Sequence, residues 1–268
     1  MALDNPLKLN FIQADAVKGF NELNVYSIKY KFLETVHRII RPQVYLQIGV
    51  RDNEYLGLAT CESIAIDLIF NPTISNNTNV KLYRTTTDGF FQFLSDKALV
   101  KPVDLFLIDG LPLIESVVHD VMHCERHAHP ASLLIVANMF PRFPEQATRW
   151  RQGRDWLGDA WKLPALLASE RPDLFILPVD VGDYGALLVA GLDPLNEQLR
   201  NTLTSLRQKS AEESHAQPSV EILARKGATP ATHPVVMNVL NTILEARQNF
   251  TSATELVAQL RVKAGLSD

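Results

Sequence analysis

Acidic residues stand where apolar segments of the chain end, and their spacing suits the binding of a nucleoside. Gly49 closes the first such segment, and Asp67 ends the second. In dinucleotide-binding folds, an acid about 20 residues beyond a glycine turn binds the ribose hydroxyls. Gly49 would let such a ligand approach the backbone closely, because glycine carries no side chain. Asp67 could instead cap the helix that follows its strand.

Three further segment ends carry polar residues. Residues 85–88 follow the third segment, Asp109 ends the fourth and Asn138 follows the fifth. Asp88 could hold an exocyclic amino group, or it could be the N-cap of the next helix. Asp109 could act as a catalytic group, or it could only bind backbone amides. Together these strand ends predict a nucleoside pocket.

Seven apolar segments are predicted to be the strands that position these residues. Most are continuous apolar runs, which is typical of strands buried on both faces. Longer amphipathic stretches between them, at 52–60, 89–96, 113–127 and 156–170, are predicted helices. This alternation predicts a parallel sheet with helices on both faces. The predicted strands are 44–50, 63–67, 80–84, 103–109, 133–137, 174–178 and 185–190.

The last two predicted strands are joined only by residues 180–184. This link is too short for a helical crossover, so the two strands must form an antiparallel hairpin. We therefore expect an α/β, Rossmann-like fold with a seven-stranded, mostly parallel sheet and an antiparallel last hairpin. Ligands of open α/β sheets bind beyond the carboxyl ends of the strands. The residues at those ends are accordingly the candidate site.

The sequence divides into three regions. Residues 1–43 are a predicted N-terminal helical lid, with a helix at 27–40; residues 44–192 form the Rossmann-like domain, and residues 193–268 are a helical C-terminal appendage. Within the appendage, Ser252 and Glu255 have the spacing of a capping box, and Gly265 stops the helix. Its apolar stripe is expected to pack either on its own domain or on another subunit, and in the second case the tail would form a homodimer. The stripe comprises Val235, Val236, Val239, Leu240, Ile243 and Leu244.

Composition narrows the classes of function. The chain has 268 residues, 46% of them hydrophobic, and 26 basic against 30 acidic residues give a net charge of -4. This balance argues against a dedicated nucleic-acid binder. No apolar run is long enough to span a membrane, and the first residues do not resemble a signal peptide. With only two cysteines, Cys61 and Cys124, the chain is expected to be a reduced, cytoplasmic protein.

Three common nucleotide or hydrolase motifs are absent. The dinucleotide fingerprint Gly-x-Gly-x-x-Gly fails because Arg51 and Glu54 stand at its later positions. No Gly-Lys-Ser/Thr of a P-loop occurs, and no Gly-x-Ser-x-Gly of an α/β-hydrolase occurs. The predicted pocket is therefore expected to bind a nucleoside-containing ligand other than a nicotinamide dinucleotide or a P-loop nucleotide.

The strand ends resemble those of class I S-adenosylmethionine-dependent methyltransferases. More narrowly, they are similar to a bacterial small-molecule O-methyltransferase-like group with Glu-Ile-Gly-x-x-x-Gly, Phe-Ile-Asp-Gly-x-His and His-Asp after strands one, four and five. The matching stretches are 47–53 (QIGVRDN), 107–112 (LIDGLP) and 137–138 (AN). Residues 156–162 (WLGDAWK) also resemble the group's Trp-x-Gly-Asp-x-Trp-Lys. The resemblance covers about residues 27–192.

The resemblance implies that S-adenosylmethionine is the cofactor. The Gly49 loop would pass its methionine part, Asp67 would hold the ribose hydroxyls and Asp88 would lie near the adenine. Residues 1–43 would form the lid, with Tyr26 and Tyr30 near its mouth. The residues implied for cofactor binding are Gly49, Arg51, Asn53, Asp67, Thr87, Asp88 and Asp109.

The sequence also departs from this group. Gln47 replaces the strand-one acid, Asn53 the last loop glycine and Pro112 the strand-four histidine. In superfamily members that use a divalent cation, acids at the ends of strands four and five hold the metal. Mg²⁺ prefers carboxylates and water, so Asp109 beside the Ala137-Asn138 pair is a poor site. We expect either a metal-independent enzyme or a chain that has lost catalysis.

Histidines recur every four residues, at His119, His123 and His127, on one stripe of a predicted helix. Zinc sites need ligands from more than one element and a supporting outer shell. The apolar positions of the same helix lie on its other face. We therefore expect the histidine stripe to face solvent and to bind no metal.

A basic and aromatic segment, residues 142–162, follows the fifth predicted strand. It could bind an acidic or sugar-like acceptor through arginine forks, or it could be an amphipathic helix with its tryptophans in the core. Asp159 could be a general base or a salt-bridge partner of Lys162. The segment's basic and tryptophan residues are Arg142, Arg149, Trp150, Arg151, Arg154, Trp156, Trp161 and Lys162.

Two functions remain open. The first is an S-adenosylmethionine-dependent methyltransferase acting on a hydroxyl or amine of a small molecule, with Asp109 and Asp159 as candidate catalytic residues. The second is a catalytically degenerate methyltransferase fold that serves as a binding or assembly module, because fold does not fix function. Neither nucleic acid nor a membrane is an expected partner.

Overall fold

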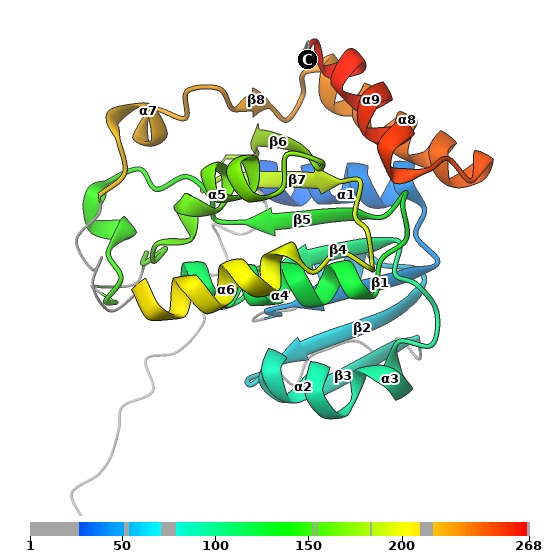
Figure 1. The fold of residues 1–268 in the computed structure, drawn as a ribbon, viewed down its shortest axis with the longest axis horizontal. Helices are drawn as coiled ribbons and strands as arrows, with labels where there is room; N and C mark the ends of the chain where they lie inside the picture. Colours follow the sequence, from blue (N-terminus) through cyan, green and yellow to red (C-terminus); the bar gives the residue numbers. More distant parts are fainter. Residues whose placement is uncertain are drawn as a thin grey trace, which may run out of the picture.

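The computed structural model describes residues 27–50, 54–70, 79–151, 153, 155–182, 184–209 and 217–266. These residues form one eight-stranded sheet with the order β3-β2-β1-β4-β5-β7-β6-β8 (Figure 1). The strands are β1 (Val44–Ile48), β2 (Glu62–Asp67), β3 (Val80–Arg84), β4 (Leu105–Ile108), β5 (Leu133–Ala137), β6 (Phe175–Asp180), β7 (Ala186–Ala190) and β8 (Thr229–Pro230).

The pairing of the strands confirms the predicted topology. β1, β2, β3, β4 and β5 pair in parallel, while β7 runs antiparallel to both β5 and β6. The predicted α/β, Rossmann-like fold and its antiparallel hairpin are therefore present. The strand count needs a correction, because the tail adds β8, which pairs in parallel with β6 and forms the edge of the sheet.

Burial explains the apolar runs. Every residue of β1, β4, β5 and β7 is buried, as expected for central strands covered on both faces. Successive β1 residues point to opposite faces: Leu46 belongs to one hydrophobic cluster and Tyr45 to the other. The core is thus two layers, one on each side of the sheet.

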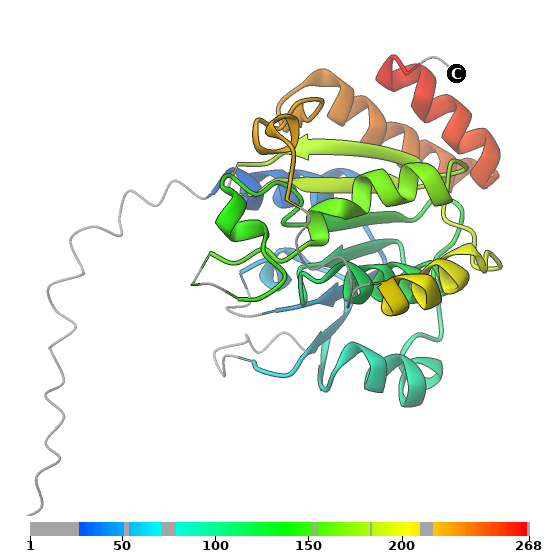
Figure 2. The same ribbon diagram turned by 60° about the vertical axis from the view of Figure 1, so that its left-hand side comes forward.

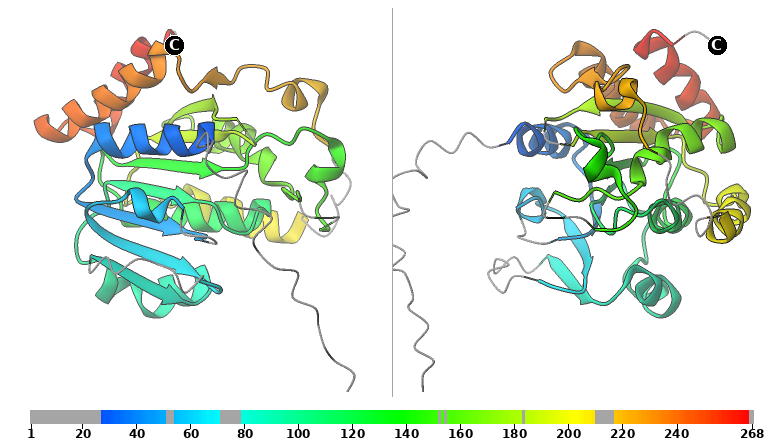
Figure 3. Two further views of the ribbon diagram at one scale, coloured as in Figure 1. Left: turned by 180° about the vertical axis from the view of Figure 1, so that it is seen from behind. Right: turned by 90° about the vertical axis from the view of Figure 1, so that its left-hand side faces the viewer.

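Helices cover both faces of the sheet (Figure 3). The cluster on one face includes residues of α2 (Thr87–Phe93), α3 (Ser95–Ala98), α4 (Ile114–Arg126), α5 (Leu163–Glu170) and α6 (Gln198–Lys209). The cluster on the other includes residues of α1 (Ile28–Ile40), η2 (Leu56–Leu58), α8 (Pro234–Asn249) and α9 (Ala253–Ala264). The remaining short helices are η3 (Pro144–Ala147), η4 (Ala160–Lys162) and α7 (Val220–Leu223).

The tail is part of this core. α8 and α9 lie side by side next to β6 and β7 (Figures 1 and 2). In the apolar stripe, Val236, Val239, Leu240 and Ile243 are buried within the chain itself. The first of the two alternatives for this stripe, packing on its own domain, is therefore confirmed. The predicted caps of α9 are also present: Ser252 accepts a hydrogen bond from the Glu255 amide, and Gly265 adopts the left-handed conformation.

Two predicted helices are shorter than expected. In the described part of 52–60 only the single turn η2 forms, because Gly57 weakens a helix too short to repay nucleation. The predicted helix at 156–170 begins later, as η4 and then α5. Gly158 explains the delay: its φ is 55°, and a Cβ there would lie 2.0 Å from the carbonyl oxygen of Pro112.

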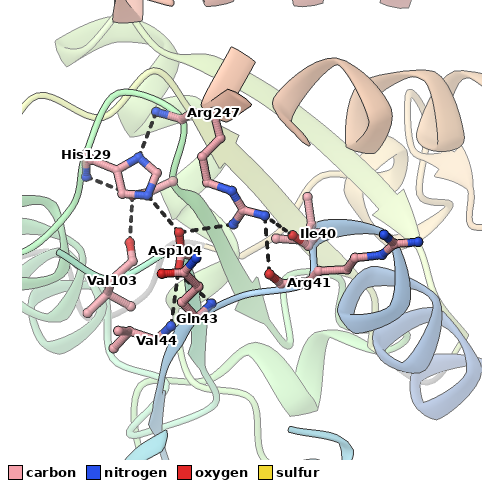
Figure 4. Close-up of polar contacts among 10 residues, drawn as sticks. Ile40, Arg41, Gln43, Val44, Val103, Asp104, His129 and Arg247 are labelled. Atoms are coloured by element: carbon pink, nitrogen blue, oxygen red, sulfur yellow. Dashed lines mark hydrogen bonds and ion pairs between the residues drawn. The ribbon is translucent and has the colours of Figure 1, made fainter. Parts of the chain in front are cut away.

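A polar junction holds the edge of the sheet opposite to the predicted site (Figure 4). Asp104 accepts hydrogen bonds from the backbone amides of Gln43 and Val44 at 2.7 and 3.0 Å. Its other oxygen lies 3.1 Å from His129 Nε2 and 3.0 Å from Arg247 Nη1. Burial would raise the pKa of Asp104, but these hydrogen bonds and the arginine lower it to about 2.

Arg247 extends this junction to the end of α1. Its guanidinium also donates to the carbonyl oxygens of Ile40 and Arg41, and Arg41 ends α1 in the left-handed conformation. A cation at a helix C-terminus is stabilising, because the last carbonyls carry partial negative charge. The junction therefore joins α1, α8 and the starts of β1 and β4.

Candidate functional site

The candidate site begins where the strand order reverses, between β1 and β4. Gly49 follows β1 with a φ of 80°, and a Cβ at this position would lie 2.1 Å from the carbonyl oxygen of Asp109. No other residue fits without a shift of the backbone. Ligands of doubly wound folds bind at this reversal, beyond the carboxyl ends of the strands. The glycine turn thus lies where the sequence predicted a ligand.

The Gln47 side chain holds the Gly49 turn in place. Its side chain is fully buried, accepts a hydrogen bond from the Tyr45 hydroxyl at 3.0 Å and donates one to the Gly49 carbonyl at 2.9 Å. An ionised acid could not donate to that carbonyl. The glutamine that replaces the strand-one acid therefore has a structural role, the support of the Gly49 turn, which the sequence did not reveal.

Asp67 lies beside the same turn. Its Oδ2 accepts a hydrogen bond from the Val50 amide at 2.7 Å, and its Oδ1 accepts one from the Ile69 amide at 3.2 Å. A carboxylate accepts hydrogen bonds, as the binding of ribose hydroxyls requires. Asp67 orders the loops after β1 and β2, at the place predicted for a ribose.

Asp109 is held by two donors. Lys29 Nζ lies 2.8 Å from its Oδ2, and Asn138 Nδ2 donates to its Oδ1 at 2.6 Å. Asn138 adopts a φ of 65°, which asparagine tolerates better than most residues. Lys29 lies in the first turn of α1, and its ammonium also lies 4.9 Å from the ring centroid of Tyr55.

Sequence reasoning did not find Lys29, which is separated from Asp109 by 80 positions. The available signal was a lysine two residues beyond Ser27, the N-cap of α1. The positive end of a helix dipole disfavours a cation there, so such a lysine needs a partner.

Asp88 is not the N-cap of α2. Thr86 caps that helix by accepting a hydrogen bond from the Gly89 amide, while Asp88 stands exposed and ion-pairs with His119 Nε2 at 2.8 Å. Thr87 makes a side-chain hydrogen bond with Asp120 of α4. Burial raises the pKa of Asp120, against the hydrogen bonds of His119 and Thr87. These residues cluster at one end of the candidate site.

The histidine stripe of α4 does not face solvent, so that prediction was wrong. The Phe91 ring of α2 stacks on His123 with centroids 4.6 Å apart, and on His127 at 5.7 Å. Burial lowers the pKa of His123 to about 3. Over the described ranges, no group of three or more histidine, cysteine, aspartate or glutamate side chains could hold a metal ion.

Asp159 ties the segment after β5 to α4. It is buried, and its Oδ1 accepts a hydrogen bond from the Ile114 amide at 2.9 Å. Its Oδ2 lies 3.1 Å from Arg149 Nη1 and 3.4 Å from Lys162 Nζ, so the predicted salt bridge to Lys162 is confirmed. Arg149 also pairs with Glu115 through both guanidinium nitrogens.

The basic and aromatic segment is not an amphipathic helix with a tryptophan core. Its described residues before η4 contain only the turn η3. Trp150 is 73% exposed, and Trp156 Nε1 donates to the Thr148 carbonyl. The Trp161 Nε1 atom is buried, with no hydrogen-bond partner among the described residues. The predicted site residues Arg51 and Asn53, with Tyr26 and Arg154, lie outside the described residues.

No membrane-spanning candidate is found: none of the helices in the described ranges combines the length and apolar character that a span requires. Cys61 and Cys124 are free thiols.

Comparison with models of protein families finds no match, and comparison with curated proteins finds none either. Solved structures are similar in fold. A cofactor-bound protein from MTB is 16% identical, with a TM-score of 0.49 over 64% of this chain and 83% of its own. An O-methyltransferase from Bacillus cereus in complex with SAH is 13% identical, with a TM-score of 0.47 over 66% and 86%.

A third solved structure is an O-methyltransferase of tomaymycin synthesis from Streptomyces achromogenes, in complex with SAM. It is 14% identical, with a TM-score of 0.47 over 66% of this chain and 86% of its own. The likeness is one of fold. The terminal hairpin of this chain is the one that the short link at 180–184 predicted.

Proposed function

We propose that this protein is an S-adenosylmethionine-dependent methyltransferase that acts on a hydroxyl or amine of a small molecule. The observation that carries the proposal is the left-handed Gly49 turn, packed against the Asp109 backbone at the reversal of strand order. A turn without a side chain at this point leaves the backbone approachable by a nucleoside-containing ligand. The sequence resemblance over residues 27–192 points to the same cofactor.

The residues present suit that cofactor. Gly49 would border its methionine part, and the Asp67 carboxylate, which lies beside the same turn, would hold the ribose hydroxyls. Thr87 and Asp88, after β3, would lie toward the adenine, with His119 fixing the Asp88 carboxylate. When bound, S-adenosylmethionine supplies an electrophilic methyl group. The protein's part is then to align that group with the acceptor, a proximity effect.

Both predicted catalytic acids have partners. Asp109 binds Lys29 and Asn138, and Asp159 binds the Ile114 amide, Arg149 and Lys162. The Lys29 ammonium, held on the Asp109 carboxylate, places a positive charge where a cation-dependent relative would bind its metal. This arrangement supports a metal-independent reaction. We assign Asp109 to the orientation of Lys29, and Asp159 to the orientation of the segment after β5.

An acidic or sugar-like acceptor is the proposed substrate class. The segment after β5 lies at the carboxyl edge of the sheet, and its Trp150 is largely exposed. Exposed aromatic faces bind sugar rings or cations. Arg149 is not part of this acceptor surface in our proposal, because Glu115 and Asp159 already hold its guanidinium.

A second candidate function follows from the same contacts. Since both predicted acids are bound internally and Gln47 replaces the strand-one acid, the fold could serve as a non-catalytic binding or assembly module. Binding of the cofactor separates this candidate from the first.

Calorimetric titration with S-adenosylhomocysteine tests the proposal. We expect binding in the micromolar range for the wild type, and at least a tenfold weaker affinity for Asp67→Asn. Glu62→Gln is the matched control, because Glu62 starts the same strand at the opposite edge and pairs with Lys81 on the surface. Thermal unfolding gives an independent check: ligand at 100 times its dissociation constant stabilises by about 2.7 kcal/mol. Absence of binding at millimolar ligand would reject the methyltransferase and favour the module.

A further inference from the structure

The Lys29 side chain is buried at the candidate site, although its position in the helix disfavours it. Only 9% of the side chain is exposed, and it lies in the first turn of α1. Burial of an ammonium costs free energy unless the charge is paired, and the positive end of the helix dipole adds to that cost. The ion pair with Asp109 offsets both terms.

The ammonium retains capacity to bind a ligand. It has three N–H donors, and the described residues provide one hydrogen bond, to Asp109 Oδ2. The Tyr55 ring, 4.9 Å away, adds a cation–π contact that uses no donor. Asn138 fixes the other oxygen of Asp109, so the carboxylate that orients Lys29 is itself anchored.

The hydrogen bonds and ion pairs of the two predicted catalytic acids restrict the chemical class of the acceptor. Asp109 is bound by Lys29 and Asn138, and both oxygens of Asp159 are bound within its own segment and α4. Neither is placed as a free base. An acceptor that is already ionised needs no base. Carboxylic acids, with pKa values near 4, are ionised at neutral pH, whereas phenols, near 10, are not.

We propose that Lys29 binds the acceptor and that the acceptor is a small carboxylate, methylated to its methyl ester. This inference rests on the proposed function and narrows its acceptor to the oxygen of a carboxylic acid in its ionised form. A lysine ammonium binds a carboxylate by a charge-assisted hydrogen bond. Lys29 is then a catalytic residue that touches the substrate, while Asp109 positions it.

The reaction balances without a proton transfer. One carboxylate oxygen forms a bond to the methyl carbon, and the bond between that carbon and the sulfonium sulfur breaks. The bonding electron pair stays on sulfur, which becomes a neutral thioether. The negative charge of the carboxylate and the positive charge of the sulfonium both disappear, and the products are a methyl ester and S-adenosylhomocysteine.

Charge pairing also predicts an order of binding. Lys29 and Asp109 together are neutral, so a second carboxylate alone would leave the buried site with a net negative charge. The sulfonium of the cofactor cancels that charge. The acceptor therefore binds after S-adenosylmethionine.

The test is transfer of a labelled methyl group from S-adenosylmethionine to a protein-free small-molecule extract of bacterial cells. Methyl esters release volatile methanol in mild base, whereas methyl ethers and methylamines do not. We expect base-labile label with the wild type. At acceptor concentrations below saturation we expect about tenfold to a hundredfold less label with Lys29→Gln, because the charge-assisted hydrogen bond that binds the carboxylate is lost. Lys29→Arg should rescue part of the label, because arginine keeps the positive charge. Lys81→Gln is the matched control, since it breaks a lysine–acid pair of similar length, 2.9 Å, at the surface.

The outcomes separate the two proposals. Base-stable label, or no labelled product from a protein that binds S-adenosylhomocysteine, overturns the carboxylate acceptor while cofactor binding stands. Base-labile label that Lys29→Gln leaves unchanged, in a variant that keeps its S-adenosylhomocysteine affinity, overturns the role of Lys29. Loss of S-adenosylhomocysteine binding by the wild type would instead reject the proposed function itself.

Discussion

Arg247 Nη1 lies 3.0 Å from Asp104 Oδ1, and this contact joins residues 143 positions apart (Figure 4). Asp104 also accepts hydrogen bonds from two backbone amides at the start of β1, those of Gln43 and Val44. The pair is therefore a structural link between the last helical pair and the start of the sheet, remote from the candidate site.

Asp104→Asn is expected to lower the free energy of unfolding by about 3 kcal/mol, because it leaves Arg247 without its buried counter-charge. Urea unfolding measures the effect. Arg200→Met is the control: Arg200 and its partner Glu197 are both more than half exposed, so its loss should cost under about 0.5 kcal/mol. Equal losses for the two variants would contradict a stabilising junction.

The same carboxylate makes stability depend on pH in the acid range. The pKa of Asp104 falls from 3.8 to about 2 on folding, so its contribution is complete above pH 4 and is lost as the pH falls from about 4 to about 2. Unfolding by urea at a series of pH values should show a steeper acid loss for the wild type than for Asp104→Asn.

His123 acts over a higher pH window. Its pKa is lowered from 6.5 to about 3 by burial, so between these values the unfolded chain binds a proton that the folded chain does not. Stability should therefore fall as the pH drops from 6.5 toward 3. In His123→Gln the slope between pH 6.5 and 4.5 should be smaller. An unchanged slope would mean that His123 is accessible to protons in the folded state.

Gly49→Ala tests the glycine turn. A methyl group 2.1 Å from the Asp109 carbonyl, on a residue with positive φ, must displace the turn, and we expect at least tenfold weaker binding of S-adenosylhomocysteine. Calorimetry measures the affinity, and circular dichroism shows whether the fold persists. Gly57→Ala is the control, since nothing lies within 4 Å of its added Cβ.

Asp159→Asn distinguishes an architectural acid from a base that touches the acceptor. The Ile114 amide should exchange its hydrogen faster, because its carboxylate acceptor loses charge, and stability should fall by about 1–3 kcal/mol. Hydrogen exchange resolves that amide. We expect S-adenosylhomocysteine affinity to be unchanged; a large loss would place Asp159 at the cofactor.

The strands and the terminal hairpin were predictable because both depend on local pattern. Continuous apolar runs mark strands buried on two faces, and the short link at 180–184 forces a hairpin. Gly49 could also be anticipated, since its conformation follows from the turn that it must make. The two-residue β8 could not, because so short a strand leaves no periodicity to detect.

The contacts of the site depended on distant partners. The sequence shows that Lys29 stands early in a helix, but only the packing of α1 on the sheet brings it to Asp109. For the histidine stripe, the pattern correctly assigned one face of α4 to the sheet. It could not show that Phe91 of α2 covers the other face.

The Arg247 guanidinium donates to the carbonyl oxygen of Ile40, which lies 207 positions earlier in the chain. During synthesis this contact can form only after those residues have been added. A ribosome adding about 5–20 residues per second makes that stretch in on the order of 10–40 s. Throughout that time the last carbonyl groups of α1 lack the Arg247 guanidinium, and one face of the sheet lacks α8 and α9. During synthesis, the nascent chain therefore exposes this apolar face of the sheet until α8 and α9 have been made.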